Sequence, residues 1–523
     1  MKQHWKWVVL TGAILGWLLD FLFWKQPLGV NFAIYASACL VGGLLMMQLT
    51  HQRMAAGDVW LIPLILIFAV SSFVRAEPLT VFLSVLLMLF LMALLAATYL
   101  GGRWWRYDLL DHAAAFWQLA RSMLIRPLGF LGDVRRLEAP RGSQPARTAL
   151  WPVLRGVLIA LPILIVFAAF LGSADVVFGS ELQVFLQVFQ LQRLPEFVFR
   201  LVFMALAAYA LIGVYLHAGS GSTNSDLAAN RKSQIPRFLG FVEAAIVLGS
   251  VAVLFAAFVV VQFQYFFGGQ ANISVQGYTY AEYARRGFGE LLAVAFFSLL
   301  MIMVFGTVSR RETRMQQRLF SALSVIIVAL VSVMLVSAFR RLNLYEMAYG
   351  FSTLRAYVHV SLIWIGLLLA AVVVLELLRR ERLFASAALM AALGFAISLS
   401  ALNVDGFIVR QNVMRASGGE PLDAPYLVSL STDADPVLVE LFAAAPGSTD
   451  TREAVGAVLA CRAAGAERRP TDWRAFTFSR WRSNAAIMRI QAGLSGYHRL
   501  DGEQSTKVVA PSGVEYDCFG SPD

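Results

Sequence analysis

Long apolar runs separated by short polar segments make up most of the chain as far as residue 401. Each run is about 20 residues long, which is the length that a helix needs to cross the hydrocarbon core of a bilayer. A helix satisfies its own backbone hydrogen bonds in lipid, so each run is predicted to be a transmembrane helix. Eleven spans are predicted, at residues 8–24, 30–49, 59–75, 79–100, 150–171, 197–217, 238–264, 289–308, 319–339, 356–378 and 383–401. The predicted fold class is therefore all-α, a polytopic helical membrane bundle.

The pattern changes after the last span. Residues 402–523, here named the tail, contain three segments with helical periodicity, which predict a small helical domain outside the membrane. Asp433 or Asp435 is placed to cap one of these helices. A core of this size is marginal on its own, which favours docking on the membrane helices or a disulfide. Cys461 and Cys518 are the only cysteines in the tail, and in an oxidising compartment they would form that disulfide, with two free thiols as the alternative.

The segment between the fourth and fifth spans divides the membrane part into two blocks. Residues 1–100 hold the first four spans, and residues 150–401 hold the other seven. The first part of residues 101–149 is rich in tryptophan and arginine, which is typical of an amphipathic helix on the inner face of a membrane. The rest of this segment is predicted to be a flexible linker. The chain is thus divided into four parts, with residues 402–523 as the last.

Composition and charge place these parts in a membrane. The chain is 59% hydrophobic and 15% charged, whereas a soluble domain carries about 25% charged residues. With the N-terminus inside, the segments between spans carry 21 Lys and Arg on the inner side and 8 on the outer side. This asymmetry predicts a cytoplasmic N-terminus and, after an odd number of spans, a periplasmic tail. The net charge of +10 is therefore mostly a consequence of topology, and it gives no reason to expect a nucleic-acid partner.

Charged residues inside the spans lie near the span ends. Asp20, Arg155, Arg200, Glu243 and Glu376 are placed where a side chain can reach the interface or pair with a neighbour. The centres of the predicted spans carry no Asp, Glu, Lys, Arg or His, which argues against a proton pump or an ion-coupled carrier with a charge relay at the midplane. Transport through neutral contacts stays open.

Motifs for cofactors, metals and nucleophiles are missing from the sequence. The six histidines and three cysteines show no HExxH or CxxC spacing, and there is no GxxxxGK[ST], GxGxxG or GxSxG. We therefore predict no catalytic residue, no metal ligand and no cofactor.

Three segments with charged and aromatic residues are predicted at the outer face. They are residues 277–292, GYTYAEYARRGFGELL, residues 340–360 and residues 402–415. One interpretation is a network of salt bridges and a tyrosine belt that hold the outer helix ends together. The other is a site for an anionic group, with arginines as forked donors. The candidate ligand-binding residues are Glu282, Arg285, Arg286, Arg341, Tyr345, Glu346, Arg355, Asp405 and Arg410.

These segments also carry a family resemblance. GYTYAEYARRGFGELL, RLNLYEMAYGFSTLRAYV at residues 341–358, LNVDGFIVRQNV at 402–413 and LDAPYLVSLSTDADPVLVELF at 422–442 resemble a bacterial inner-membrane family catalogued as a domain of unknown function, number 4173, with the related number 4153. The resemblance implies a multi-pass protein of the bacterial cell envelope. It supplies no catalytic residues.

Three functions are compatible with the sequence. The first is a non-enzymatic membrane component with a structural, sensor or assembly role, whose partners are membrane lipids and an anionic envelope ligand. The second is a transporter of a neutral or amphipathic solute between the two span blocks. The third is an envelope enzyme acting on a lipid-linked substrate, with Glu282 or Asp405 as a base.

Overall fold

The computed structural model describes residues 4–101, 104–138, 194–220, 222, 239–267, 288–380, 383–444, 450–466, 472–501 and 506–518, with the single positions 160, 167, 171 and 175. The chain divides into two compact units. Unit 1 contains residues 1–25, 38–53 and 117–221, and unit 2 contains residues 26–37, 54–116 and 222–523. Each unit is described by itself.

Helices of membrane-spanning length account for most of the described residues. Ten helices there are long and apolar enough to cross a membrane: Trp5–Phe23, Val30–Leu49, Ala56–Val74, Pro78–Thr98, Pro195–Ser220, Phe241–Gln262, Gly289–Val308, Arg314–Tyr349, Thr353–Leu377 and Phe384–Leu402. They coincide with ten of the eleven predicted spans, and the remaining prediction, at 150–171, lies outside the described residues apart from single positions. The all-α polytopic fold class is confirmed.

Unit 1 is built on the pairing of α1 (Trp5–Phe23) with α8 (Leu194–Ser220). Val8, Met46 and Leu216 belong to its small core, to which α2 (Val30–Leu49) and α5 (Leu109–Glu138) also contribute. Near the end of α1, the buried carboxylate of Asp20 accepts hydrogen bonds from Arg200 Nε at 3.0 and 3.1 Å and forms an ion pair with Nη2. The structural pairing expected for charges inside spans is therefore confirmed for these two residues.

Helix α5 corresponds to the amphipathic helix predicted in residues 101–149, which follows the short 3-10 helix η3 (Trp104–Arg106). It continues to Glu138, a few residues into the predicted linker, and the residues after it lie outside the described part of the chain. Trp117 and Leu124 are 72% and 69% exposed on α5, as expected of side chains that face lipid.

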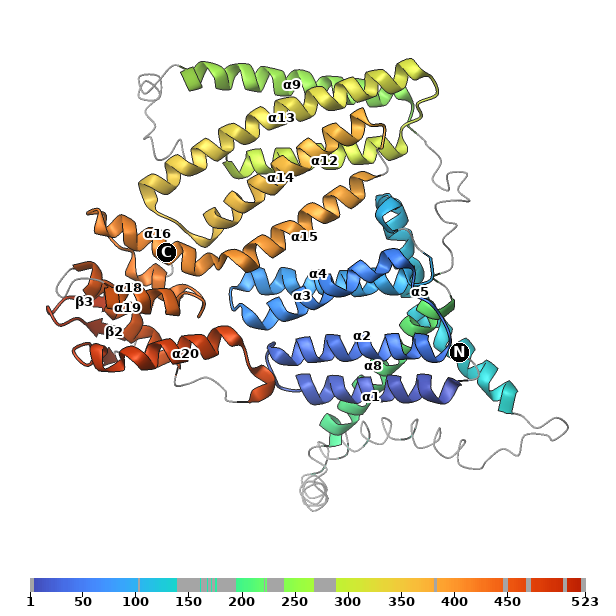
Figure 1. Cartoon of the computed structure of the whole chain (residues 1–523), viewed down its shortest axis with the longest axis horizontal. Helices are drawn as coiled ribbons and strands as arrows, with labels where there is room; N and C mark the ends of the chain where they lie inside the picture. Colours follow the sequence, from blue (N-terminus) through green and yellow to red (C-terminus); the bar gives the residue numbers. More distant parts are fainter. Residues whose placement is uncertain are drawn as a thin grey trace. The chain divides into compact units, whose positions relative to one another are not determined.

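The membrane helices of unit 2 lie side by side (Figure 1). They are η2 (Ala56–Trp60) with α3 (Leu61–Val74), α4 (Pro78–Thr98), α9 (Phe241–Phe267), α12 (Phe288–Val308), α13 (Arg314–Tyr349), α14 (Thr353–Leu377) and α15 (Phe384–Leu402). Buried side chains of α9, α12, α13 and α14 form one continuous apolar core. In a bilayer such close contacts stabilise helix association by packing, because lipid tails are as apolar as the side chains.

Helix α13 is longer than the predicted ninth span. Thr313 begins it with a capping box to Gln316, and the helix continues through the arginine-rich segment to Tyr349. Gly350 ends it with φ of 76°, and α14 begins three residues later. The segment 340–360, which was predicted as a connection between spans, is thus mostly two helix ends and one tight turn.

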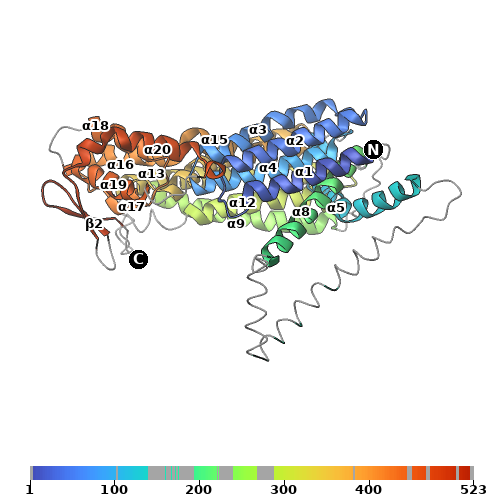
Figure 2. The same cartoon turned by 90° about the horizontal axis from the view of Figure 1, so that it is seen from below.

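The tail contains more than the predicted helices. It consists of α16 (Val404–Ser417), α17 (Ala424–Ser429), α18 (Asp435–Ala444), α19 (Asp450–Ala466), η7 (Trp473–Ala475), α20 (Phe478–Ile490) and η8 (Gln491–Leu494), followed by β1 (His498–Asp501), β2 (Thr506–Val509) and β3 (Glu515–Asp517). The strands form an antiparallel sheet in the order β1-β2-β3, which the sequence analysis did not predict. Figures 1 and 2 show the tail helices gathered at one end of α13, α14 and α15.

A buried arginine organises the centre of the tail. Arg462 on α19 forms an ion pair with Asp435 and donates to the backbone carbonyls of Val428 at 2.8 Å, Leu430 at 2.7 Å and Ser431 at 2.6 Å. These carbonyls belong to the end of α17 and to the turn that follows it. Because a buried charge is tolerated only when its hydrogen-bonding capacity is used, this arrangement fixes the conformation of the turn.

Cys461 and Cys518 form a disulfide in the structure, which links α19 to the end of β3. The cysteines are separated by 57 residues, so the cross-link is expected to stabilise the folded tail by about 4 kcal/mol in the chain-entropy description.

We expect alkylation of the full chain without reductant, followed by mass spectrometry, to modify Cys39 only after unfolding and to leave both tail cysteines unmodified. Reductant should lower the unfolding temperature. Alkylation of both tail cysteines in protein taken from intact cells would contradict the pairing and the oxidising compartment.

Candidate functional site

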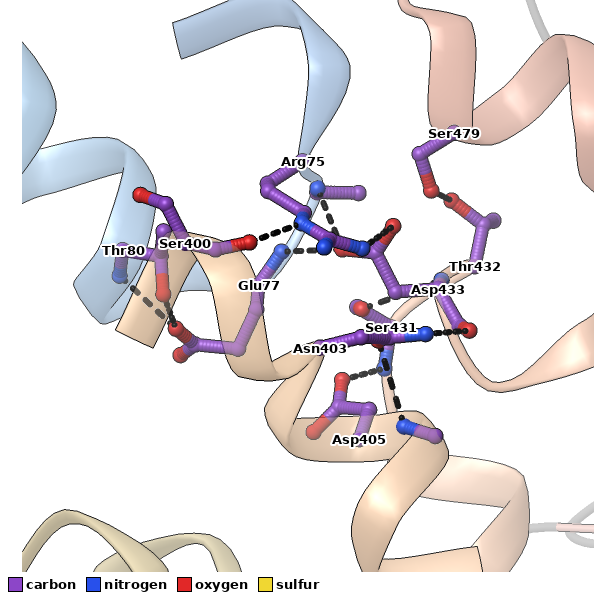
Figure 3. A network of polar contacts seen from close by, with 12 residues as sticks. Arg75, Glu77, Thr80, Ser400, Asn403, Asp405, Ser431, Thr432, Asp433 and Ser479 are labelled. Atoms are coloured by element: carbon purple, nitrogen blue, oxygen red, sulfur yellow. Dashed lines mark hydrogen bonds and ion pairs between the residues drawn. The ribbon is translucent and has the colours of Figure 1, made fainter. Parts of the chain in front are cut away.

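Polar residues from three distant parts of unit 2 meet at one end of its membrane helices (Figure 3). They come from the turn between α3 and α4, from the passage between α15 and α16, and from the loop before α18. We name Arg75, Glu77, Asn403, Asp405 and Asp433 the polar junction. Glu77, Asp405 and Asp433 are at most 6% exposed, and Arg75 and Asn403 lie at helix caps.

Asp433 joins the tail to the turn between α3 and α4. Its Oδ2 accepts hydrogen bonds from the backbone N–H of Ala76 at 2.7 Å and of Glu77 at 3.3 Å, and its Oδ1 lies 4.0 Å from Nη1 of Arg75. Hydrogen bonds to a charged acceptor are stronger than those between neutral groups. Asp433 does not cap its own helix α18 but holds a turn that lies more than 350 positions earlier in the chain.

Glu77 begins α4 and ties it to α14. It is the N-cap residue, with Pro78 in the first turn, and its carboxylate accepts from the backbone N–H of Leu79 at 2.8 Å and Thr80 at 2.7 Å. These are donors that a helix start leaves without an internal partner, and negative charge is favourable there. The hydroxyl of Tyr357 on α14 also donates to Glu77. The Glu77 side chain that makes these contacts is only 2% exposed.

Arg75 caps the C-terminal end of α15. Its Nε donates to the carbonyl oxygen of Ser400 at 2.6 Å, and its Nη2 donates to that of Ala401 at 3.4 Å, both in the last turn of α15. Cations are favourable at these unpaired carbonyls. Burial lowers the pKa of Arg75, Asp433 raises it and Arg482 lowers it again, but a guanidinium stays charged in proteins.

Asn403 forms the corner between α15 and α16. It has φ of 51°, a left-handed conformation that asparagine tolerates better than most residues. Its Oδ1 accepts from the backbone N–H of Gly406 at 3.2 Å and caps α16, while its Nδ2 donates to the backbone carbonyl of Asp433 at 3.2 Å. One side chain therefore sets the helix corner and holds the tail loop against it.

Asp405 is the least compensated member of the junction. It is 1% exposed, and its Oδ2 accepts from the backbone N–H of Ser431 at 2.8 Å. Among the described residues its Oδ1 has no hydrogen-bond partner. Burial raises the pKa of Asp405, hydrogen bonds from Ser431 lower it, and the nearby charges of Glu77 and Asp433 raise it. Burial is the largest of these influences, and the pKa of Asp405 is raised overall.

The sequence-predicted ligand-binding residues lie in different places. Tyr345 and Glu346 on α13 lie near Arg355 on α14, whose guanidinium carbon is 4.0 Å from the centroid of the Tyr345 ring. Arg355 donates to the carbonyl of Gly350. An oxygen of the buried Glu346 lies 3.3 Å from Nδ1 of His359.

Arg341 is half-buried on α13. Asp405 belongs to the polar junction, and Arg410 forms an exposed ion pair with Glu440 at 2.7 Å. Glu282, Arg285 and Arg286 lie outside the described residues.

Most of the polar junction was missed by the sequence analysis. Arg75 was counted only for orientation, and Glu77 was not singled out. A usable pattern was present, because Glu77-Pro78 directly before an apolar run is typical of a helix start. The partners of Asp433 could not be found in this way, because they are set by tertiary contacts and not by local spacing.

Comparison with known proteins gives a family and no relative of known function. The family model described as Domain of unknown function (DUF4153) matches residues 62–441, which include the whole polar junction. The number that matches is thus 4153 and not 4173. No curated protein and no solved structure matches the chain.

Replacing Asp433 by Asn tests the connection between the tail and the α3–α4 turn. We expect D433N to lower the free energy of unfolding by about 2 kcal/mol, because a buried carboxylate that accepts two backbone hydrogen bonds loses its charge. The exposed Glu440, which pairs with Arg410, gives the matched control, and E440Q should cost less than about 1 kcal/mol. Thermal unfolding of the purified full chain measures both. Equal effects of the two variants would contradict the assigned role of Asp433.

Asp405 should make stability depend on pH. Its pKa is raised in the folded state, so the folded protein holds the proton more tightly than the unfolded chain, whose ordinary value is 3.8. The contribution of Asp405 to stability is therefore present at low pH and is lost as pH rises through the folded pKa. We expect D405N to remove this loss of stability. The unfolding temperatures of D405N and of the unmodified protein, compared from about pH 4 to about pH 8, measure the difference.

The half-buried Asp472 supplies a control. Hydrogen bonds from Arg474 lower the pKa of Asp472 below its ordinary value of 3.8, so its contribution to stability is complete above that pH, and D472N should leave the pH dependence between about pH 4 and about pH 8 unchanged. A pH profile of D405N that runs parallel to that of the unmodified protein would show that Asp405 is not the titrating group.

Proposed function

This chain belongs to the domain-of-unknown-function family DUF4153, and on that premise we propose that it is a non-enzymatic, multi-pass component of the bacterial inner membrane. In this proposal the membrane helices carry the tail as a rigidly attached domain on the periplasmic face. The role is structural or in assembly: the tail presents a fixed surface to other envelope molecules.

The observation that carries this proposal is the use of buried carboxylates inside the polar junction. Glu77 and Asp433 are 2% and 6% exposed, and their oxygens accept hydrogen bonds from backbone groups of the same unit. A general base must reach a substrate proton directly or through one water, and carboxylates engaged in this way are unsuited to that task. The same contacts hold the tail on α3, α4 and α15, as attachment requires.

The sidedness of the tail is supported by two independent features. The excess of Lys and Arg in alternate segments favours a cytoplasmic N-terminus and a periplasmic tail. The disulfide between Cys461 and Cys518 is of the kind that persists in an oxidising compartment such as the periplasm.

The partners that fit the proposal are membrane lipids and an anionic envelope ligand. In the α13–α14 corner, the guanidinium of Arg355 lies on the ring of Tyr345 and donates to the carbonyl of Gly350, and a guanidinium has five N–H donors in all. The buried Glu346 lies 3.3 Å from Nδ1 of His359. Tyr345, Glu346 and Arg355 are three of the six predicted ligand-binding residues that the structure describes, and the others are Arg341 on the same helix, Asp405 and Arg410.

An envelope enzyme is the second candidate, because one acid of the junction has an oxygen without a partner. That acid is Asp405, whose Oδ1 is the only feature of the described junction that suits a general base. A transporter for a neutral or amphipathic solute is the third candidate, and it would require a path between the two span blocks.

The test uses D405N in cells that lack the protein. We expect D405N at normal abundance to restore the growth or envelope phenotype of a deletion strain fully, because the proposal gives Asp405 no chemical step. D433N, which weakens tail attachment, should restore it less well at matched abundance. E440Q is the control with an intact junction. Loss of function in D405N, with normal abundance and an unfolding temperature no lower than that of the unmodified protein, would overturn the non-enzymatic proposal in favour of catalysis.

A further inference from the structure

A small hollow lies beside the polar junction, on the side of α20. It has a volume of about 70 Å³ and is lined by residues of α3, the α15–α16 corner, the loop before α18, and α20. The lining residues are Val74, Arg75, Asn403, Thr432, Asp433, Pro436, Ser479 and Arg482. A water molecule occupies about 30 Å³ of liquid, so the hollow has room for a group somewhat larger than one water.

Two arginines border this hollow. The guanidinium of Arg75 is held by the α15 carbonyls, and Arg482 on α20 is close enough to lower the pKa of Arg75. Arg482 is exposed, and its guanidinium carbon lies 5.9 Å from the centroid of the Phe478 ring. Within the described residues no carboxylate forms an ion pair with Arg482. Two like charges are thus brought together, and Asp433 is the one acidic residue among those that line the described hollow.

The hydroxyls at the base of the hollow leave one donor unused. Thr432 and Ser479 are 7% and 2% exposed, and their oxygens are 2.7 Å apart. Only one of the two hydroxyl protons can lie between them. In the part of the chain that the structure describes, neither hydroxyl has another hydrogen-bond partner, so the second proton is left to donate to a guest. Asn403 also has a second amide proton beyond the one given to Asp433.

Asp433 does not cancel this positive character. Its Oδ2 accepts from two backbone N–H groups, and its Oδ1 faces Arg75 at the long distance of 4.0 Å. One carboxylate against two guanidiniums leaves a net positive hollow with hydroxyl and amide donors. Acceptors with several oxygens and negative charge are the chemical complement of such a donor set.

We propose that the hollow bordered by Arg75 and Arg482 binds one phosphate group, with Arg482 as the donor on the solvent side and the Thr432–Ser479 pair as the donor at the base. The group comes either from free phosphate or from the headgroup of an anionic phospholipid. This site is separate from the α13–α14 corner and does not depend on the non-enzymatic role, because an enzyme or a transporter could hold the same group.

The test uses the purified full chain in an uncharged detergent, with inorganic phosphate as the probe at constant ionic strength. We expect phosphate, but not chloride, to raise the unfolding temperature and to give saturable heat in titration calorimetry. R482Q should weaken phosphate binding at least about tenfold, because a charge-assisted contact is lost. R489Q is the matched control, since Arg489 is also exposed on α20 but does not line the hollow. It should bind phosphate as the unmodified chain does.

A conservative variant guards against an indirect effect of R482Q. R482K keeps the charge but not the forked geometry, so its affinity should fall between those of the unmodified chain and R482Q. The proposal is wrong if R482Q binds phosphate as tightly as the unmodified chain, or if R489Q loses as much affinity as R482Q.

Nanodiscs distinguish the two sources of the phosphate group. Free phosphate should bind to the protein in phosphatidylcholine discs. If the natural source of the group is a lipid headgroup, adding phosphatidylglycerol to the discs should abolish the binding of free phosphate. If the natural source is soluble phosphate, the binding should stay unchanged. Either result supports the site. Failure of both phosphate and phosphatidylglycerol to bind in an Arg482-dependent way would overturn it.

Discussion

The contact between Asp433 and the turn that joins α3 to α4 is the interaction on which the arrangement of unit 2 depends. That turn ends one membrane helix and begins the next, so it exposes backbone donors and acceptors that neither helix can satisfy. Asp433 accepts from Ala76 and Glu77, and Arg75 donates to the last carbonyls of α15. The tail therefore completes the hydrogen bonding of the α3–α4 turn, and its removal would take away the acceptor of the Ala76 and Glu77 N–H groups.

Burial decides how these charges behave. A buried charge without partners is costly, whereas one that accepts or donates several hydrogen bonds can be retained. Asp433, Glu77 and Arg462 each use backbone groups as partners, and backbone groups cannot be lost by substitution of another side chain. The positions of α4, α15 and the loop before α18 are fixed relative to one another as a result. Specific geometry is obtained here from polar contacts at the helix ends, while the apolar core supplies packing between the helices.

The parts of this fold that could be predicted from sequence are those governed by local physics. Spans follow from the length of apolar runs, and ten described helices coincide with them. The end of α13 was placed too early, because Arg340 and Arg341 interrupt the apolar run without ending the helix. The polar junction could not be predicted, because Asp433 and the turn that it holds are separated by most of the chain. Arg355 and Asp405 stand out in the sequence by their charge. Charge alone cannot show that the two residues belong to different corners of the structure.

Asp405 and Asp433 show why the same residue type takes different roles within one junction. Asp433 lies where two backbone donors and an arginine converge, so ionisation is compensated. Asp405 receives hydrogen bonds from Ser431 but lies near Glu77 and Asp433, and burial adds to their repulsion. A carboxyl that favours its neutral form can itself donate a hydrogen bond, which the ionised form cannot. Burial and the two neighbouring acids therefore oppose the charged form of Asp405, whereas the backbone donors of the α3–α4 turn give the carboxylate of Asp433 two hydrogen bonds.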